Sequence, residues 1–574
     1  MKPVRLPAAA VLALPRWALF VLGLLYILPG LIGRDPWKND DAASFGIMWT
    51  MAQGGWQDWL LPNIAGLAMP DEGPLAYWLG AIGIKLFGWL LGDIAGARIA
   101  TVAVFLLGAL SVWYATFNLG RRPDAQPLRL AFGGQPEPDD FGRTLADAAV
   151  LIYLGSLGLL LHSHESTAEG LQVALTAFLV YRAIRYIELS TLRNAALTGL
   201  ALGLMTLTRG YVVPAALTLA LFVCTRFLAL PAARALRDLA VSVLVAAAIA
   251  ALWLLPAHLL LAPGQSPLPG WLAWNSLQFA LPTLLSLRFF LRVGLWFFWP
   301  AWPFASWAVY AWRRQHHVLH IVMPVTFVSM GALLALFHPN PEQGQLLVLL
   351  PPLAIMAAFG LLTMKRGAIN AIDWFSVMAL TLCAAVIWVF WIAKLTGWPA
   401  QAARNALKLV PGFKPELGLL ALLVAAAATA GWIALVHWRI SRQPAVLWRA
   451  VVLSSGGLIL IWILLMTLFL PDMNYSKSYA AVARQIAEKL PAGTSCIETN
   501  VGPAQRASFA YFGKLPFTGT DGGRCEVLLL QDSTKVRDDR EIAAQHRGKQ
   551  WTLLWEGRRA SDRDERFRLY RRAD

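Results

Sequence analysis

Two pairs of acidic side chains stand out in a chain of 574 residues of which only 14% are charged. Asp40 and Asp41 follow the first apolar stretch, and Glu165 and Glu169 lie in the short polar segment 162–169 between two later apolar stretches. A carboxylate at such a place could act as a general base on a hydroxyl group. Because Glu165 and Glu169 are four residues apart, they share a face if a helix begins early. A helix cap and a solvated loop are the alternative interpretations.

Histidines add a second kind of chemistry to segment 162–169. His162 and His164 stand beside Glu165, and these three side chains are weak candidates for a divalent metal site. The sequence has no HExxH motif in a suitable context, so the metal requirement stays open, with solvated loop residues as the alternative. Together with other polar residues on the same side we take them as candidate substrate-binding residues: Asp71, Glu72, Tyr77, His162, His164, Glu165 and His338.

Cations that could bind a phosphate are few. Arg209 lies between two apolar segments, where a guanidinium needs an anionic partner. A lipid phosphate is one candidate, and an ion pair with Glu165 or Glu169 is the other. Arg98 and Lys85 are further candidates for binding a donor phosphate, and snorkelling at the membrane interface is the alternative for Arg98.

The composition identifies the elements that must position these residues. Hydrophobic residues make up 57% of the chain, well above the proportion in soluble domains, so we expect a polytopic α-helical membrane protein and no nucleic-acid partner. We expect about thirteen transmembrane segments. They are 16–33, 97–119, 143–161, 168–188, 195–210, 212–230, 238–262, 289–312, 317–337, 345–363, 370–393, 416–437 and 447–470. The pair 195–210 and 212–230 could instead be one long broken helix.

The basic residues sort by loop. If the N-terminus is cytoplasmic, 20 of the 49 Lys and Arg residues lie in the cytoplasmic segments, 11 in the opposite loops and 18 after residue 471. This bias predicts a multi-pass protein of the bacterial inner membrane whose tail is periplasmic. We read the first apolar stretch as a retained span, because it lacks an evident cleavage site for a signal peptidase.

Two regions outside the spans have structure of their own. In the periplasmic loop 34–96, we expect a helix from Asn39 or Asp40 to about Gln53, and a second apolar stretch, 75–91, lying in or against the membrane interface. The tail, 472–574, alternates helix and strand signals and predicts a small α/β domain, which leaves 1–471 as the transmembrane part. Cys496 and Cys525 in the tail could form a disulfide or remain two buried thiols.

Several short motifs resemble those of one family, in the same order. The first family motif is matched by Asp40-Asp41 and by the helix end Met51-Ala-Gln-Gly-Gly55-Trp56. The second family motif, a turn, is matched by Asp71-Glu72-Gly73-Pro74-Leu75-Ala76-Tyr77-Trp78. Glu169-Gly170-Leu171, Leu207-Thr208-Arg209-Gly210 and Gln345–Pro352 follow. Over about residues 16–365 the chain resembles the GT-C polyprenol-phosphate-dependent glycosyltransferases, specifically the aminoarabinose-transferase (ArnT)-like and protein O-mannosyltransferase-like superfamily.

The resemblance implies an inverting transferase that moves one sugar from a polyprenyl phosphate, such as undecaprenyl phosphate, to a lipid, glycan or protein acceptor in the cell envelope, with lipid A modification as one option. It implies that Asp40 deprotonates or orients the acceptor hydroxyl, with Asp41 beside it. It further implies that Glu169 is the second acid and that Arg209 stabilises the leaving phosphate. No cofactor is certain, although a divalent metal is an option.

Three departures from the family pattern are visible. Glu72 stands where the family has Lys, the second acid is Glu rather than Asp, and Ala42 and Ala43 occupy the place of the usual Arg. The alternative function is a transporter or flippase for a lipid-linked sugar, and a third interpretation is a membrane anchor for the tail. A flippase would need polar residues at the bilayer midplane, whereas the polar groups here gather at one face.

Overall fold

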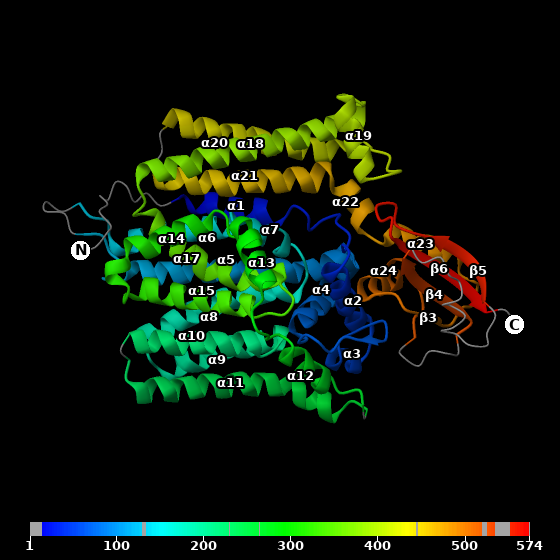
Figure 1. Cartoon of the computed structure of the whole chain (residues 1–574), viewed down its shortest axis with the longest axis horizontal. Helices are drawn as coiled ribbons and strands as arrows, with labels where there is room; N and C mark the ends of the chain where they lie inside the picture. Colours follow the sequence, from blue (N-terminus) through cyan, green and yellow to red (C-terminus); the bar gives the residue numbers. More distant parts are fainter. Residues whose placement is uncertain are drawn as a thin grey trace.

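The structure is a computed structural model of the whole chain. It describes residues 14–128, 134–228, 230–262, 264–442, 446–518, 525–533 and 551–572. Long helices lie side by side, and the tail is attached at one end of this bundle (Figure 1). The helices of the bundle are α1 (Arg16–Ile27), α5 (Asp93–Arg121), α6 (Pro138–Leu154), α8 (Ala168–Glu188), α9 (Leu192–Arg209), α10 (Val212–Phe227), α11 (Ala232–Leu259), α13 (Leu284–Phe297), α14 (Ala301–Ala311), α15 (Leu319–Leu336), α17 (Leu350–Leu361), α18 (Arg366–Thr396), α20 (Leu419–Arg442) and α21 (Val446–Leu468).

The bundle has the composition of a membrane protein. Among the described residues, seven helices are long and apolar enough to cross a membrane, and α13 with α14 makes an eighth if this bent pair is one span. Each of the segments that the sequence predicts to span overlaps a helix of the bundle. Small residues let neighbouring helices approach closely: a Cβ on Gly360 of α17 would lie 1.9 Å from the carbonyl oxygen of Phe304 on α14.

Two predicted spans differ in detail, and a third region decides between two alternatives. The segment 289–312 is not one helix, because α13 and α14 meet at an angle of 100°. Pro300 immediately precedes α14, and proline cannot continue a helix from the preceding turn. The segment 143–161 is interrupted after Leu154, where the N–H of Leu157 donates to the carbonyl oxygen of Trp299, and a short helix α7 (Leu157–His162) follows. The segments 195–210 and 212–230 form two helices, α9 and α10, which are separated at Gly210 with φ +105°.

Short elements cover the end of the bundle next to the tail. They are α2 (Asp40–Gln53), α3 (Trp56–Leu60), β1 (Asn63–Ile64), β2 (Leu67–Ala68), α4 (Leu75–Leu91), α12 (Leu268–Ser276), α16 (Gln343–Leu346) and α19 (Ala400–Leu409), with a 3₁₀ turn at Leu347–Leu349. A second 3₁₀ turn, Arg313–Gln315, lies between α14 and α15. The predicted helix from Asp40 to Gln53 is confirmed as α2. The second predicted stretch, 75–91, is α4, which packs against α2 and α5 and leaves Trp89 exposed.

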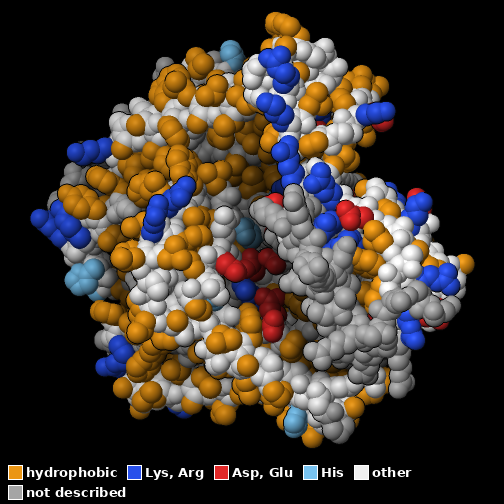
Figure 2. Space-filling view, turned by 45° about the vertical axis from the view of Figure 1, so that its right-hand side comes forward, with side chains coloured by type: hydrophobic (Ala, Val, Ile, Leu, Met, Phe, Trp, Pro, Cys, Tyr) orange, Lys and Arg blue, Asp and Glu red, His pale blue; other side chains and the backbone are white. Residues whose placement is uncertain are grey.

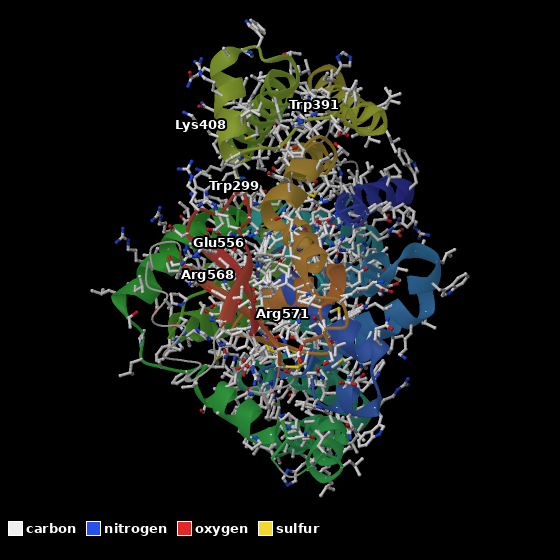
Figure 3. All side chains as sticks on the ribbon, turned by 90° about the vertical axis from the view of Figure 1, so that its right-hand side faces the viewer. Trp299, Trp391, Lys408, Glu556, Arg568 and Arg571 are labelled. Carbon is white, nitrogen blue, oxygen red and sulfur yellow. A yellow bond between two sulfur atoms is a disulfide. The ribbon has the colours of Figure 1, made fainter. Side chains whose placement is uncertain are left out.

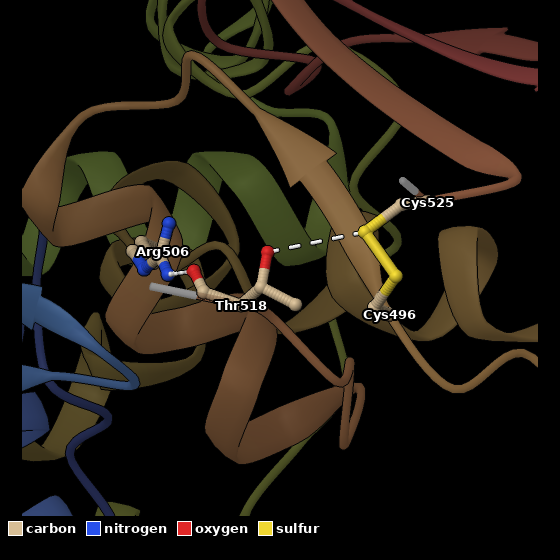
Figure 4. The surroundings of a disulfide bond; sticks show 4 residues. All are labelled: Cys496, Arg506, Thr518 and Cys525. Atoms are coloured by element: carbon tan, nitrogen blue, oxygen red, sulfur yellow. Dashed lines mark hydrogen bonds between the residues drawn. A yellow bond between two sulfur atoms is a disulfide. The ribbon is translucent and has the colours of Figure 1, made fainter. Parts of the chain in front are cut away.

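The tail combines helices and a sheet. Its helices are α22 (Leu470–Lys477), α23 (Ala480–Lys489) and α24 (Pro503–Phe512). Its strands are β3 (Ile497–Thr499), β4 (Val527–Ser533), β5 (Trp551–Gly557) and β6 (Glu565–Arg572), in the order β3-β4-β6-β5 with only β3 and β4 parallel. Cys496 and Cys525 form a disulfide across a Cα–Cα distance of 5.4 Å (Figure 4). This resolves the choice that the sequence left open.

The tail packs directly on the loop that contains α2. Arg506 on α24 donates to the carbonyl oxygens of Ile64 at 2.9 Å and Ala65 at 2.7 Å, and also to that of Thr518, which lies beside the disulfide (Figure 4). Gly46 of α2 faces Ala507 of α24, and α2 and α24 are in extensive contact. The tail therefore supports α2, the helix that begins at Asp40.

The close contact at Gly46 can be tested by adding one methyl group. A Cβ at Gly46 would lie 2.4 Å from the Cβ of Ala507, so Gly46→Ala should force α2 and α24 apart and cost about 1–3 kcal/mol, which a fall in Tm would report. Gly23→Ala in α1 is the control, because a Cβ there meets nothing within 4 Å. Equal Tm values for the two variants would contradict the tight packing of α24 on α2.

Candidate functional site

Acidic side chains gather in a hollow at the end of the bundle that carries the tail (Figure 2). The side chains come from segments that are far apart in the sequence. They belong to the start of α2, the turn 70–74 before α4, the segment 162–169 and the segment 338–345, and Arg209 at the end of α9 lies among them. The convergence that the sequence predicts for the polar face is thus present in the fold.

Arg209 lies at the centre of this cluster between two carboxylates. Its Nε atom is 2.8 Å from Oε1 of Glu72, and its Nη1 atom donates to Oε1 of Glu169 at 3.1 Å. The hydroxyl of Tyr77 donates to the other oxygen of Glu72 at 2.8 Å, and Nε2 of His162 is 3.7 Å from Oε2 of Glu169. The ion pair considered from the sequence therefore forms with Glu169, and Glu72 is a second partner that the sequence did not indicate.

Local backbone geometry brings Glu72 to Arg209. The N–H of Gly73 donates to the carbonyl oxygen of Thr208 at 3.1 Å, and a Cβ on Gly73 would lie only 2.0 Å from the carbonyl oxygen of Leu207. The turn 70–74 is therefore pressed against the last turn of α9. Arg209 ends that helix, where the helix dipole favours a positive charge.

The segment 338–345 closes the other side of the cluster. A Cβ on Gly344 would lie 1.6 Å from Oε1 of Glu169, so α16 can approach that carboxylate only because residue 344 is glycine. Glu342 precedes α16 and is close enough to raise the pKa of Asp40 by its charge. Glu342 was not among the predicted site residues, although its loop lacks Lys and Arg, and that pattern could have indicated it.

Asp40 has a free carboxylate. It is the first residue of α2, is exposed in the hollow and accepts no hydrogen bond from the part of the chain that the structure describes. Partial desolvation raises its pKa above the usual range, and the charge of Glu342 acts in the same direction. Arg209 and His162 counteract part of this increase in pKa. A carboxylate with a raised pKa and without a fixed partner is suited to accept a proton.

Asp41 has a different environment from its neighbour. It is buried, and its oxygens accept hydrogen bonds from Arg34 at 3.2 Å, from the N–H of Trp37 at 3.1 Å and from the N–H of Ser166 at 3.1 Å. The nearest nitrogen of Arg98 is 3.8 Å away. These contacts join the segment before α2 to the segment 162–169, so we place Asp41 among the positioning residues rather than the reacting ones.

Of the three predicted phosphate-binding cations, only Arg209 is in the cluster. Arg98 is buried and donates to the carbonyl oxygens of Leu31 at 3.0 Å and Asp35 at 3.1 Å, and also to that of Arg34. Lys85 is exposed on α4, about 15 Å along the helix from Leu75 at the normal rise per residue. Arg34 is a buried cation that sequence reasoning missed, and it also donates to the carbonyl oxygen of His164 at 2.6 Å.

The three metal-ligand candidates do not form a metal site. His164 is buried and places its ring nitrogens 2.6 Å from the carbonyl oxygen of Leu160 and 2.8 Å from that of Tyr26. Burial lowers its pKa to about 4 and raises that of Glu165 to about 8, with the charge of Asp41 as the next contribution for Glu165. Within the described ranges, no group of three or more His, Cys, Asp or Glu side chains is arranged to hold a metal ion.

A cavity adjoins Arg209. It is small and has polar and apolar walls, which are formed by Gln172, Arg209, Val212, Val213, Trp274, Gln278, Leu334, His338, Gln345 and Val348. His338 is fixed there, with Nε2 at 2.8 Å from Oε1 of Gln278, and burial lowers its pKa so that the ring is neutral near pH 7. Nη2 of Arg209 has no partner among the described residues. An anionic group in this cavity could therefore bind Arg209 while the ion pairs of Arg209 with Glu72 and Glu169 stay in place.

Asp71 completes the predicted set. It is exposed in the turn before α4. Partial desolvation of its carboxyl group raises its pKa, and the negative charge of Glu72 adds a smaller increase. The structure therefore brings together most of the predicted residues, while Lys85, Arg98 and His164 have other surroundings.

The chain is similar to the same kind of transferase in part of its sequence and in its fold. No protein-family model matches the chain. An undecaprenyl phosphate-alpha-4-amino-4-deoxy-L-arabinose arabinosyl transferase of Pseudomonas paraeruginosa is 31% identical over 109 residues, which is 19% of each chain. A second such transferase, from Pseudomonas fluorescens, is 32% identical over 136 residues, or 22% of each chain. The chain thus matches about a fifth of the length of these curated relatives.

The fold comparison extends over almost the whole molecule. The crystal structure of ArnT from Cupriavidus metallidurans bound to undecaprenyl phosphate matches with a TM-score of 0.66 and 15% sequence identity, covering 96% of this chain and 97% of that one. The same enzyme in the apo state matches with a TM-score of 0.64. The chain is therefore a membrane protein with the GT-C glycosyltransferase fold of the ArnT type, as the resemblance of its motifs predicts.

Proposed function

We propose that this protein is an inverting glycosyltransferase that moves one sugar from a polyprenyl-phosphate carrier to an envelope lipid, glycan or protein. The observation that carries the proposal is the free, exposed carboxylate of Asp40 beside Arg209, in a hollow of a GT-C fold. The structural relative with this fold binds undecaprenyl phosphate, and the curated relatives are named for transfer from that carrier. Both similarities support a lipid-phosphate sugar donor here.

The geometry supports a single displacement. Asp40 accepts the proton of the acceptor hydroxyl while that oxygen forms a bond to the anomeric carbon of the sugar. The bond from the anomeric carbon to the phosphate oxygen breaks, and the electron pair leaves with the phosphate. Arg209, which lines the adjoining cavity, stabilises the charge that develops on the phosphate. Glu72 and Glu169 hold the guanidinium in place for this role.

The charge balance of the cluster bears on the sugar. Asp40, Asp71, Glu72, Glu169 and Glu342 outnumber Arg209, its central cation. An excess of carboxylates favours a sugar that carries an ammonium group, and the curated relatives are named for a 4-amino sugar. We therefore propose an amine-bearing donor sugar.

The proposal includes an orientation in the membrane. About thirteen spans over residues 1–471 with a cytoplasmic N-terminus would place the hollow and residues 472–574, as a separate α/β domain, on the periplasmic side. The position of the polar cluster at one end of the bundle, on the side of the tail, supports this arrangement (Figures 1 and 2). It also favours an enzyme over a flippase, whose site would lie near the middle of the helices.

Asp40→Asn removes the proposed base with little change in shape. Because its carboxylate accepts no hydrogen bond from the described residues, Tm should be unchanged, whereas the rate of sugar transfer should fall about 100-fold or more. The wild-type rate should rise with pH through the raised pKa of Asp40, and this increase should be absent from the variant. Asp139→Asn is the control, because Asp139 is an exposed acid in the first turn of α6. Full activity of Asp40→Asn would exclude Asp40 as the base.

Arg209→Ala should act mainly on the donor. Loss of the guanidinium should lower kcat, because Arg209 stabilises the leaving phosphate, and should raise the KM for the polyprenyl-phosphate sugar about tenfold or more, with a smaller effect on the KM for the acceptor. Arg404→Ala on α19, an exposed arginine remote in sequence from the cluster, serves as the control and should change neither constant. An unchanged donor KM in Arg209→Ala would refute the phosphate-binding role.

Gly344→Ala tests the position of Glu169. The new Cβ would occupy the place of Oε1 of Glu169 and displace that carboxylate from Arg209. A displacement of this size should lower kcat/KM about 10- to 100-fold. Gly431→Ala in α20, where a Cβ meets nothing within 4 Å, should retain full activity. If both variants are equally active, Glu169 does not need its observed position.

A further inference from the structure

A second site lies apart from the acidic hollow, where α18, α19, α21 and α22 meet. An open groove lies there, and its walls are almost entirely apolar. It is lined by Val386, Ile387, Phe390, Ala406, Leu409, Val410, Leu465, Phe469, Asp472, Met473 and Ser476. In Figure 3, which looks onto the end with the tail, α19 is marked by Lys408 and stands apart from the sheet marked by Arg568 and Arg571.

One charged side chain lines this apolar groove. Asp472 on α22 is 6% exposed, and its Oδ2 accepts a hydrogen bond at 2.7 Å from Nζ of Lys394 on α18. The ammonium of Lys394 also lies 4.7 Å from the ring centre of Phe469 and is itself buried. The second oxygen, Oδ1 of Asp472, is buried and has no hydrogen-bond partner. A buried carboxylate oxygen without a donor is costly, so a ligand that brought a donor to Asp472 would remove this cost.

The walls of the groove indicate a lipid chain. Part of them comes from α18 and α21, which have the length and hydropathy of membrane spans. Val386 is 46% exposed and Leu409 is 73% exposed, so the groove continues into an apolar surface that would face the bilayer. A hydrocarbon chain from the adjacent leaflet can enter such a groove without losing its apolar surroundings.

The orphan carboxylate oxygen selects the headgroup. A headgroup that presents only a phosphate would place a negative charge against Oδ1 of Asp472. A primary ammonium group would instead donate a charge-assisted hydrogen bond to it. We propose that the groove binds an amine-bearing phospholipid, with one acyl chain between α18 and α19 and the ammonium on Asp472.

Binding of this lipid would also affect the backbone near Asp40, because Asp472 lies on α22. Two residues further along α22, Oδ1 of Asn474 accepts hydrogen bonds from the N–H of Asp35 at 3.1 Å and from Nε1 of Trp37 at 3.0 Å. Asn474 also donates to the carbonyl oxygen of Gly33 at 2.8 Å. The segment that leads into α2 is therefore held by the helix that lines the lipid groove. Lipid in the groove would fix α22 and, through Asn474, the backbone that precedes Asp40.

Binding can be measured without any assumption about the enzymatic activity. The full chain, purified and stripped of lipid, is titrated with dioleoylphosphatidylethanolamine and with dioleoylphosphatidylcholine, and bound lipid is counted by native mass spectrometry. The two lipids share their chains and phosphate, but the trimethylated amine has no N–H to donate. We expect the ethanolamine lipid to bind about tenfold more tightly, the order expected for one hydrogen bond to a charged group. Equal binding, or tighter binding of dioleoylphosphatidylglycerol, would overturn the proposal.

A pair of variants locates the effect. Asp472→Asn should abolish the preference for the ethanolamine lipid. Asp373→Asn is the matched control. Like Asp472, Asp373 on α18 is buried, pairs with a cation (Arg439, at 2.8 Å) and has an unpartnered Oδ1, but it does not line this groove. It should retain the preference. Loss of the preference in both variants, or in neither, would show that Asp472 does not receive the headgroup.

Discussion

The ion pairs of Arg209 with Glu72 and Glu169 hold the candidate site together. They join the turn before α4, the start of α8 and the end of α9, which are separated by many residues in the chain. All three side chains are largely withdrawn from water, so each charge depends on the others for compensation. Removing one partner would leave uncompensated charge at low solvent exposure, which makes this triad a strong constraint on the arrangement of the surrounding helices.

A second network fixes the backbone on which the reacting carboxylate stands. Asp41 binds Arg34 and the N–H of Ser166, and Arg98 holds the carbonyl oxygens that precede α2. The two adjacent acids therefore have different roles because their environments differ. Asp41 is buried and saturated with donors, whereas Asp40 faces the hollow without a fixed partner. The tail adds to this support, because α24 packs on α2 and Asn474 binds the loop ahead of it.

Much of this arrangement could be predicted from local sequence. The start of α2 at Asp40 and the gathering of Glu72, Glu169 and Arg209 follow from ordered motifs and from charge on one face. Arg34 could not be found in this way, because its importance comes from contacts with distant segments that no local pattern reports. Glu342 was missed although the absence of Lys and Arg from its loop could have indicated it. The break between α13 and α14 was signalled by Pro300, but the apolar run on both sides masked it. Strand β6 has only Phe567 and Leu569 on its apolar face, while Arg566 and Arg568 pair with Asp532, so its hydrophobic signal was weak.

The anomeric configuration of the product is the most direct measure of the central claim. The purified protein would be supplied with a polyprenyl-phosphate-linked sugar of defined configuration and with envelope lipids, and the glycosylated product would be analysed by NMR. A single displacement with Asp40 as base predicts a covalent product in which the anomeric centre is inverted. A product of retained configuration, or movement of the lipid-linked sugar across the bilayer without any covalent transfer, would contradict the account.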